Sequence, residues 1–304
     1  MTIEIVDPTR LKDSLSCLRL YFWRHERHVI PVKPRLPLIY GNAVHACLAA
    51  HYEGKSGAVA FGAFEDTWTA ALAQDGGPVA EPELFQEDED PKRNPTRWLE
   101  QWVLYRKQYA VEPFSVRNVE VPFFLPLTDD LALAGIIDLV VEYLGQIMIV
   151  DHKTTSYLNH RWIATFNPNH QFSAYLLAAN ELIKPDRPIT TLLVNAILSH
   201  KTESNPDKLF ARIPTTRSTA QLEEERDELV GWWRIVRECR RTGSWPKNDQ
   251  RCQDYQGCDY HPLCTDIQAN FRRLIPSPAL FKEEAWDPIR SLRRHGADLP
   301  EGVV

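Results

Sequence analysis

Two aspartates and a lysine interrupt an apolar stretch of the sequence, GIIDLVVEYLGQIMIVDHKTTS, at residues 135–156. Such side chains cost several kcal/mol each when they are buried without partners. The pattern predicts two strands joined at a glycine. If the hairpin turns between residues 145 and 146 through an even-numbered loop, Asp138 pairs with Lys153. Asp151 then shares their face and lies diagonally from Asp138, whereas an odd-numbered loop would turn Asp138 to the other face.

Two carboxylates that converge on one point favour a bound cation. They repel each other unless a cation lies between them, and hard oxygen ligands suit Mg2+ or Mn2+. A neighbouring lysine can orient or deprotonate a water on the metal, while the metal polarises a phosphoryl oxygen. These residues therefore predict phosphodiester hydrolysis. The alternative is a cross-strand ion pair of Asp138 and Lys153 at a sheet edge, with Asp151 capping a turn.

The order of these residues resembles the core of the PD-(D/E)XK nuclease superfamily. Asp138 and Asp151-His152-Lys153 match its acidic positions and its lysine, although Ile137 stands where the superfamily's name has proline. Two further motifs resemble its RecB-type branch, which includes iron-sulphur nucleases of CRISPR adaptation and phage RecB-like exonucleases. They are a Q-x-x-x-Y at Gln171 and Tyr175 and a G-x-x-x-H from Gly41 to His45.

The resemblance implies a role for each of these side chains. The metal ligands would be His45, Asp138, Asp151 and the backbone carbonyl of His152. Lys153 would position the attacking water, and Gln171 and Tyr175 would line the site and contact DNA. A neutral imidazole suits Mn2+ better than Mg2+. Alternatively, Tyr175 is a half-buried helix aromatic and Gln171 a surface residue; Glu120 could add a carboxylate or face solvent.

The cysteines form a second pattern. In a cytoplasmic chain, six cysteines favour metal or thiol chemistry over disulfides. CQDYQGCDYHPLC has five residues between successive cysteines, without the C-x-x-C turn typical of zinc knuckles. The resemblance implies a structural [4Fe-4S] cluster held by Cys17, Cys252, Cys258 and Cys264. A zinc site that uses His261, or a set of free thiols, is the alternative, and Cys47 and Cys239 are expected to be buried small hydrophobes.

Composition limits the class of protein. The chain has 304 residues, 43% of them hydrophobic, and a formal net charge of -6. This charge argues against a nonspecific nucleic-acid coat, which relies on excess Lys and Arg, but allows one local basic groove. Two arginine groups, at 234–241 and 290–294, are more typical of solvated helix faces. The N-terminus has no signal pattern and charge breaks every long apolar stretch, so we expect a cytoplasmic protein without membrane spans.

The helices and strands that must position these residues are predicted from hydrophobic periodicity and from the positions of turn and capping residues. Helices are expected over 10–27, 41–54, 59–74, 95–110, 169–183 and 219–241. Strands are expected over 116–127, 131–143, 146–154 and 190–200. We expect Pro31, Pro34 and Pro37 to form a rigid connector without helix, and Asn167 and Pro168 to take the N-cap and first helical positions. The acidic loop 82–95 is expected to be mobile.

This order predicts an α/β fold with a mixed central sheet flanked by helices, a restriction-endonuclease-like core. One integrated fold would comprise a helical N-terminal region (1–112), a nuclease core (113–215) and a helical cluster region (216–304). The function expected is metal-dependent cleavage of DNA by an exonuclease or end-processing nuclease on single strands or frayed ends. DNA would be the substrate in repair or recombination, with a helicase, recombinase or integrase as partner. The alternatives are a catalytically inactive DNA-binding or scaffold subunit and a thiol-based redox or zinc protein.

Overall fold

The computed structural model describes residues 3–32, 35–73, 90–253, 257–267, 270–285, 287 and 289–296. Most of the acidic loop that was expected to be mobile, residues 82–89, lies outside this set. The chain divides into two compact units. Unit 1 combines residues 1–33, 124–135 and 223–304, and unit 2 combines residues 34–123 and 136–222.

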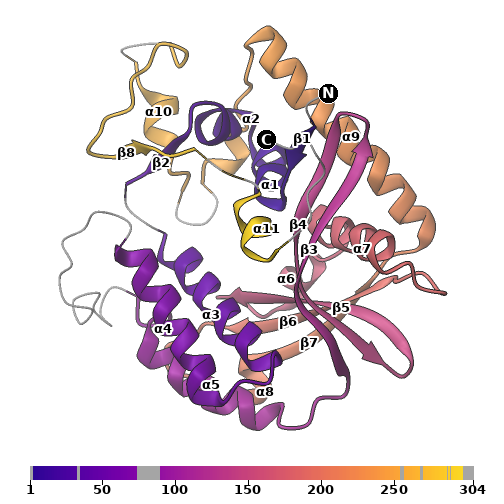
Figure 1. Cartoon of the computed structure of the whole chain (residues 1–304). Coiled ribbons are helices and arrows are strands. Elements are labelled where there is room, and N and C mark those ends of the chain that lie inside the picture. The colour runs from indigo at the N-terminus through magenta and orange to yellow at the C-terminus, as the bar shows by residue number, and fades with distance from the viewer. Residues whose placement is uncertain are drawn as a thin grey trace. The chain divides into compact units, whose positions relative to one another are not determined.

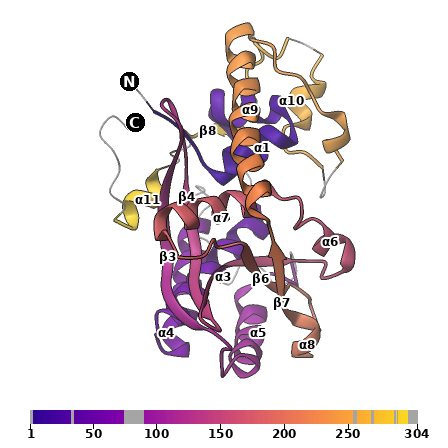
Figure 2. The same cartoon turned by 90° about the vertical axis from the view of Figure 1, so that its right-hand side faces the viewer.

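The main sheet is mixed, as the sequence predicted; most of its residues belong to unit 2, whereas residues 124–135 belong to unit 1. Its longer strands are β3 (Ser115–Thr128), β4 (Leu131–Tyr143), β5 (Gln146–Thr155), β6 (Thr191–Leu198) and β7 (Phe210–Thr216). β3 pairs with β4, and Figure 2 shows the two side by side. β4 and β5 are antiparallel, β5 and β6 parallel, and β6 and β7 antiparallel. The parallel step is possible because a helical crossover connects β5 to β6.

Three helices cover one part of this sheet (Figure 1). They are α3 (Leu36–Tyr52), α4 (Gly57–Ala73) and α5 (Pro95–Gln108). Their aromatic core includes Tyr40, Phe64 and Trp98, none of which is exposed. The crossover contains α6 (His160–Ala164) and α7 (His170–Ile183), and the short α8 (Pro206–Leu209) precedes β7. α6, α8 and β7 were not predicted, since each is too short or too irregular for a clear period.

Two helix starts were predicted wrongly. α3 begins at Leu36 and takes Pro37 into its first turn, where the missing N–H of proline is harmless. The N-cap of α7 is Asn169 instead of Asn167, because the Asn169 side chain accepts the Phe172 N–H at 3.1 Å. Pro168 therefore lies before the helix.

Unit 1 brings together the two ends of the chain. Its main elements are β1 (Glu4–Val6), α1 (Pro8–Ser16), α2 (Leu18–Tyr21), the π-helix η1 (Phe22–Glu26), β2 (Val29–Pro31), α9 (Thr219–Thr242), η3 (Asp249–Arg251), α10 (His261–Thr265), β8 (Phe281–Glu283) and α11 (Arg290–Arg294). β1 runs parallel to the first residues of β4, and β2 pairs antiparallel with β8. Apolar residues from both chain ends, including Trp23 and Phe281, pack into one cluster.

The single helix predicted over 10–27 is interrupted at Cys17. This residue is extended (φ -162°, ψ 118°), and the Arg19 N–H donates to the Pro246 carbonyl at 3.1 Å instead of continuing the helix. A tertiary contact thus overrides the local helical pattern. None of the helices in the described part of the chain combines the length and the apolar composition needed to cross a bilayer.

Candidate active site

The β4–β5 hairpin turns one residue earlier than predicted. Leu144 and Gly145 both have left-handed backbones (φ 50° and 74°), which is the geometry of a two-residue hairpin loop. The even-numbered loop keeps Asp138 on the expected face. The register pairs Leu139 with Val150, so one step further Asp138 is level with Asp151, not with Lys153.

The ladder between the two strands ends where the carboxylates begin. Beyond Leu139, the Asp138 Oδ2 accepts the His152 backbone N–H at 2.6 Å, in place of a backbone carbonyl. Asp138 and Asp151 are 8% and 2% exposed. The end of this hairpin pairing therefore holds two buried acidic side chains on interior strands of the sheet.

His45 reaches the same point from α3. Its Nδ1 lies 3.5 Å from Asp138 Oδ1. Gly41, one helical turn earlier, faces β5, since a Cβ at this position would lie 3.4 Å from Thr154 Oγ1, which is about an ordinary contact distance. The G-x-x-x-H motif thus lies against β5 and brings its histidine to the acidic pair.

Lys153 forms an ion pair with its neighbour on the same face of β5. Its Nζ lies 2.7 Å from Asp151 Oδ2 and 3.0 Å from Oδ1. It also lies 5.6 Å from the Phe172 ring of α7. In the described residues, the nearest cation to Asp138 is thus His45 and the nearest to Asp151 is Lys153. The ligand atoms of His45, Asp138 and Asp151 are not all within 4.8 Å of one another.

Charge is crowded at this site, and the pKa values reflect it. Burial, reinforced by Asp138 and opposed by Lys153, raises the pKa of Asp151 to about 6. Burial and the charge of Asp138 also raise the pKa of Glu120 to about 8. Burial alone would raise the pKa of Asp138, but His45 holds it below its usual range. The Asp138 charge, acting against burial, raises the pKa of His45 to about 9. Such a site favours the binding of a cation.

Glu120 is half-buried beside Asp138 and His45, so it does not simply face solvent. Its backbone is left-handed (φ 48°), which is rare for a residue with a side chain and locally distorts β3. The Glu120 carboxyl is close enough to Asp138 for the Asp138 charge to raise its pKa. Sequence reasoning named Glu120 only as an open possibility, because a single left-handed residue leaves no mark in the alternation of residues.

Gln171 and Tyr175 lie together on α7. The Gln171 Nε2 donates to the Tyr175 hydroxyl at 3.1 Å, as expected for residues four apart. Tyr175 is 7% exposed and its ring lies 5.8 Å from that of Phe123 on β3. The Lys153–Phe172 contact brings the first turn of α7 to the face of β5 that carries the lysine.

The imidazole of His152 points away from Asp151 and Lys153, as alternation along a strand requires. It is 1% exposed and meets the Asn195 side chain at 2.9 Å. Sequence reasoning used only the carbonyl of His152 and missed Asn195 and Arg212. The available signal was a lone amide inside the apolar strand TLLVNAIL, since a buried amide needs partners.

The four cysteines of the second pattern all belong to unit 1. Cys17 stands at the break between α1 and α2, and its Sγ accepts the Asn248 N–H at 3.3 Å. Burial, together with the charges of Cys17 and Cys252, raises the pKa of Cys258. Burial, together with the charges of Cys17 and Cys258, also raises the pKa of Cys264. The four thiols are thus close enough to interact.

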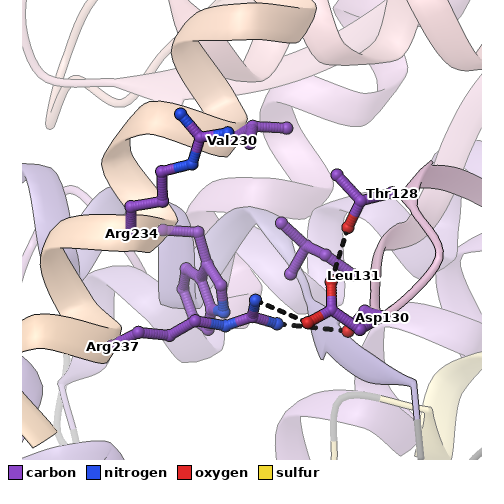
Figure 3. Close-up of a pocket in the computed structure, with 7 residues that line it drawn as sticks. Thr128, Asp130, Leu131, Val230, Arg234 and Arg237 are labelled. Carbon is purple, nitrogen blue, oxygen red and sulfur yellow. Dashed lines mark hydrogen bonds and ion pairs between the residues drawn. The ribbon is translucent and has the colours of Figure 1, made fainter. Parts of the chain in front are cut away.

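A cavity of about 150 Å3 lies elsewhere, in unit 1 (Figure 3). Its lining includes Leu131, Trp233, Arg234 and Arg237, and none of the predicted site residues. Arg237 pairs with Asp130 at 2.8 Å, and Arg240 pairs with Glu26 at 2.8 Å. Acidic partners therefore neutralise much of the arginine group on α9, which does not form a bare basic groove.

Comparison with known proteins identifies the fold family. The model of the PD-(D/E)XK nuclease superfamily matches residues 6–265. The search of curated proteins gave no match. Among solved structures, the chain resembles a "Putative exonuclease" from Eubacterium rectale with 10% identity and a TM-score of 0.51, over 82% of this chain and 86% of that one. The alkaline exonuclease LHK-Exo from Laribacter hongkongensis has 10% identity and a TM-score of 0.27, over 68% of this chain and 97% of that one.

Proposed function

This chain belongs to the PD-(D/E)XK nuclease superfamily, and from this premise we propose that it is a metal-dependent deoxyribonuclease that hydrolyses phosphodiester bonds. The observation that carries the proposal is the meeting of Asp138, Asp151 and His45 at the open end of the β4–β5 hairpin, with Lys153 held against Asp151. The alternative interpretation, a cross-strand ion pair at a sheet edge, needs only one carboxylate. Two buried carboxylates with a third nearby fit a cation-binding site better.

The donor set suits Mg2+ or Mn2+. His45, Asp138, Asp151 and the backbone carbonyl of His152 would hold the ion. Glu120 lies near enough to Asp138 for the two charges to interact, so its carboxylate could contribute a further ligand. When bound, such an ion polarises a phosphoryl oxygen and activates water. Burial raises the pKa of Asp151 to about 6, with a smaller contribution from the Asp138 charge. A divalent cation between the two carboxylates would favour the ionised form of both.

The other residues of the site act on water and DNA. Lys153 is proposed to hold the attacking water through Nζ, since Asp151 keeps this group beside the acidic pair. Gln171 and Tyr175 are proposed to guide the substrate, and their mutual hydrogen bond fixes them as one unit. The Q-x-x-x-Y and G-x-x-x-H motifs support assignment to the RecB-type branch.

The segment after Lys153 supports single-stranded or frayed DNA as the substrate. Residues 152–180 contain no Asp or Glu, although the chain has 41 of them. Within this segment Tyr157 is 61% exposed, and His160 and Arg161 are also exposed. Exposed aromatic rings beside basic groups suit unpaired bases, which stack on rings while the backbone meets positive charge. The name of the relative from Eubacterium rectale favours exonuclease action.

We further propose that Cys17, Cys252, Cys258 and Cys264 hold a structural [4Fe-4S] cluster. The charges of Cys17 and Cys252 act on Cys258, and those of Cys17 and Cys258 act on Cys264, so the four thiols lie near one another within unit 1. Four cysteine thiolates are the usual ligand set of such a cluster. The cluster would join the two ends of the chain within unit 1.

The test is incubation of end-labelled single- and double-stranded DNA with the purified protein and Mn2+ or Mg2+. We expect shortened products that depend on the metal and disappear with EDTA. Lys153→Ala should remain folded and cleave DNA at least about 100-fold more slowly. Binding of DNA without cleavage by the wild-type protein, with both metals, would instead identify an inactive DNA-binding subunit.

A further inference from the structure

A line of three polar residues crosses the sheet behind the candidate active site. The register places His152 of β5 opposite Asn195 of β6, and Asn195 opposite Arg212 of β7. Arg212 Nε donates to Asn195 Oδ1 at 2.9 Å, and Asn195 Nδ2 lies 2.9 Å from His152 Nδ1. His152 and Asn195 are buried, so this line is shielded from solvent.

The chemistry of arginine determines the orientation of the amide. A guanidinium group only donates hydrogen bonds, so the atom of Asn195 that faces Arg212 must be its oxygen. The amide nitrogen therefore faces the other side. Its two hydrogens have two partners, the Tyr105 hydroxyl at 2.9 Å and His152 Nδ1.

The same reasoning determines the tautomer of His152. Because Asn195 Nδ2 can only donate, His152 Nδ1 must accept and cannot carry a proton. The ring proton then resides on Nε2. This atom is buried and has no hydrogen-bond acceptor among the described residues. The ring stacks on Tyr52 and lies 5.7 Å from the ring of His45, which is a proposed metal ligand.

Arg212 is itself held firmly. Its two terminal nitrogens donate to both carboxylate oxygens of Glu112, at 3.1 and 2.8 Å. One of them also donates to the hydroxyls of Tyr52 and Tyr105, and the guanidinium lies 4.0 Å from the Tyr109 ring. A bidentate ion pair beneath a ring leaves the guanidinium little freedom to turn. The orientation of Asn195 is therefore as rigid as Arg212.

We propose that Arg212 and Asn195 are positioning residues that lock His152 as the neutral Nε2–H tautomer beside the acidic site. The lock anchors the residue between Asp151 and Lys153, whose backbone carbonyl is a proposed metal ligand. This inference rests on the proposed function only for its effect on metal binding, because the tautomer follows from the hydrogen bonds alone.

The test replaces the donor at position 195 by an acceptor of the same shape. In Asn195→Asp, one carboxylate oxygen still accepts from Arg212. The other oxygen replaces the amide nitrogen that faces His152, and it can accept a hydrogen bond but not donate one. A hydrogen bond from the ring to this oxygen requires a proton on Nδ1, so the neutral ring should change to the Nδ1–H tautomer and release the proton from Nε2. Nitrogen-15 NMR of histidine-labelled, metal-free protein at neutral pH should find Nδ1 bare and Nε2 protonated in the wild type, and Nδ1 protonated in the variant.

A matched control is Asn180→Asp on α7. The Asn180 side chain donates to the carbonyls of Leu176 and Ile189 and accepts from the Ile189 N–H, and it forms no hydrogen bond with His152. This variant should keep the wild-type tautomer. Mn2+ titration calorimetry without DNA should find affinity reduced about 10- to 100-fold in Asn195→Asp, a loss typical of residues that orient metal ligands, and little changed in Asn180→Asp.

Two results would overturn the inference. One is wild-type protein with the proton on Nδ1, a measurement that needs no variant and so is independent of whether any variant folds. The other is an Asn195→Asp variant that folds and keeps the wild-type NMR pattern and Mn2+ affinity. If the wild-type protein bound no Mn2+ and cut no DNA, the proposed function would fail, while the NMR experiment would still decide the tautomer.

Discussion

Asp151→Asn is expected to stabilise the metal-free protein while it abolishes DNA cleavage. The carboxyl of Asp151 has an ordinary pKa of 3.8, and burial, with Asp138 adding and Lys153 opposing, raises this pKa to about 6. A carboxyl whose pKa is higher in the folded than in the unfolded state weakens the fold wherever it is ionised. At about 1.36 kcal/mol per pH unit, the difference corresponds to about 3 kcal/mol at neutral pH. Asparagine has nearly the same shape and no charge, so it removes this penalty.

Asp138→Asn is the matched comparison, with the opposite expected sign. Burial acts to raise the pKa of Asp138, but His45 and its hydrogen bond lower it below the usual range. The folded state therefore favours the ionised form, and loss of the charge should destabilise the protein at neutral pH. Both variants should lose cleavage, because each removes a proposed metal ligand.

Urea unfolding in EDTA, followed by circular dichroism, measures both effects. At pH 7 we expect the free energy of unfolding to rise by up to about 3 kcal/mol in Asp151→Asn. The gain should shrink as the pH falls from about 6 to about 4, because the folded wild-type protein takes up the proton first and loses the penalty. Equal destabilisation of the two variants at pH 7, or a gain of the same size at both pH values, would refute the reasoning.

Further outcomes are expected at four other residues. Lys153→Ala should lower the rate of DNA cleavage with Mn2+ at least about 100-fold, as loss of proton-transfer groups does, while circular dichroism remains unchanged; near-normal rates would remove Lys153 from the site. Tyr157→Ala should weaken binding of a single-stranded oligonucleotide in EDTA by about 1–3 kcal/mol per lost stack, measured by fluorescence anisotropy, and unchanged affinity would exclude Tyr157 from the DNA-binding surface. Cys17→Ser, purified without oxygen, should lose the visible absorption of an iron-sulphur cluster; a colourless wild-type protein would contradict the cluster. Burial raises the pKa of Cys47 to about 12, so native protein at pH 8 should resist alkylation at Cys47 by iodoacetamide in mass spectrometry, and rapid modification would contradict its burial.

Much of the nuclease core could be predicted because its signals are local. Alternation of apolar residues specified β3, β4 and β5 almost to their ends, and the G-x-x-x-H motif specified one helical turn from Gly41 to His45. The spacing of Asp151 and Lys153 placed both on one face of a strand, where they form an ion pair. The parity of the hairpin loop was sufficient to place Asp138 on the expected face.

The register of that hairpin was not predictable in the same way. A glycine marks a turn but does not say which two residues form it. The left-handed backbone at Leu144 moved the turn by one residue and the pairing by two, so Asp138 came level with Asp151. Leucine has no intrinsic preference for this conformation, and it is maintained by the pairing of the whole hairpin.

Residue type and local spacing by themselves determined the mixed α/β class, the order of the motifs and the identity of the acids, the lysine and the cysteines. Only the tertiary structure decided the break at Cys17, the left-handed backbone at Glu120 and the line from Arg212 through Asn195 to His152. The physical reason is the separation along the sequence of the residues that interact. Helical and strand periods arise between neighbours in the chain, whereas these three features depend on hydrogen bonds and burial supplied by segments far away in the sequence.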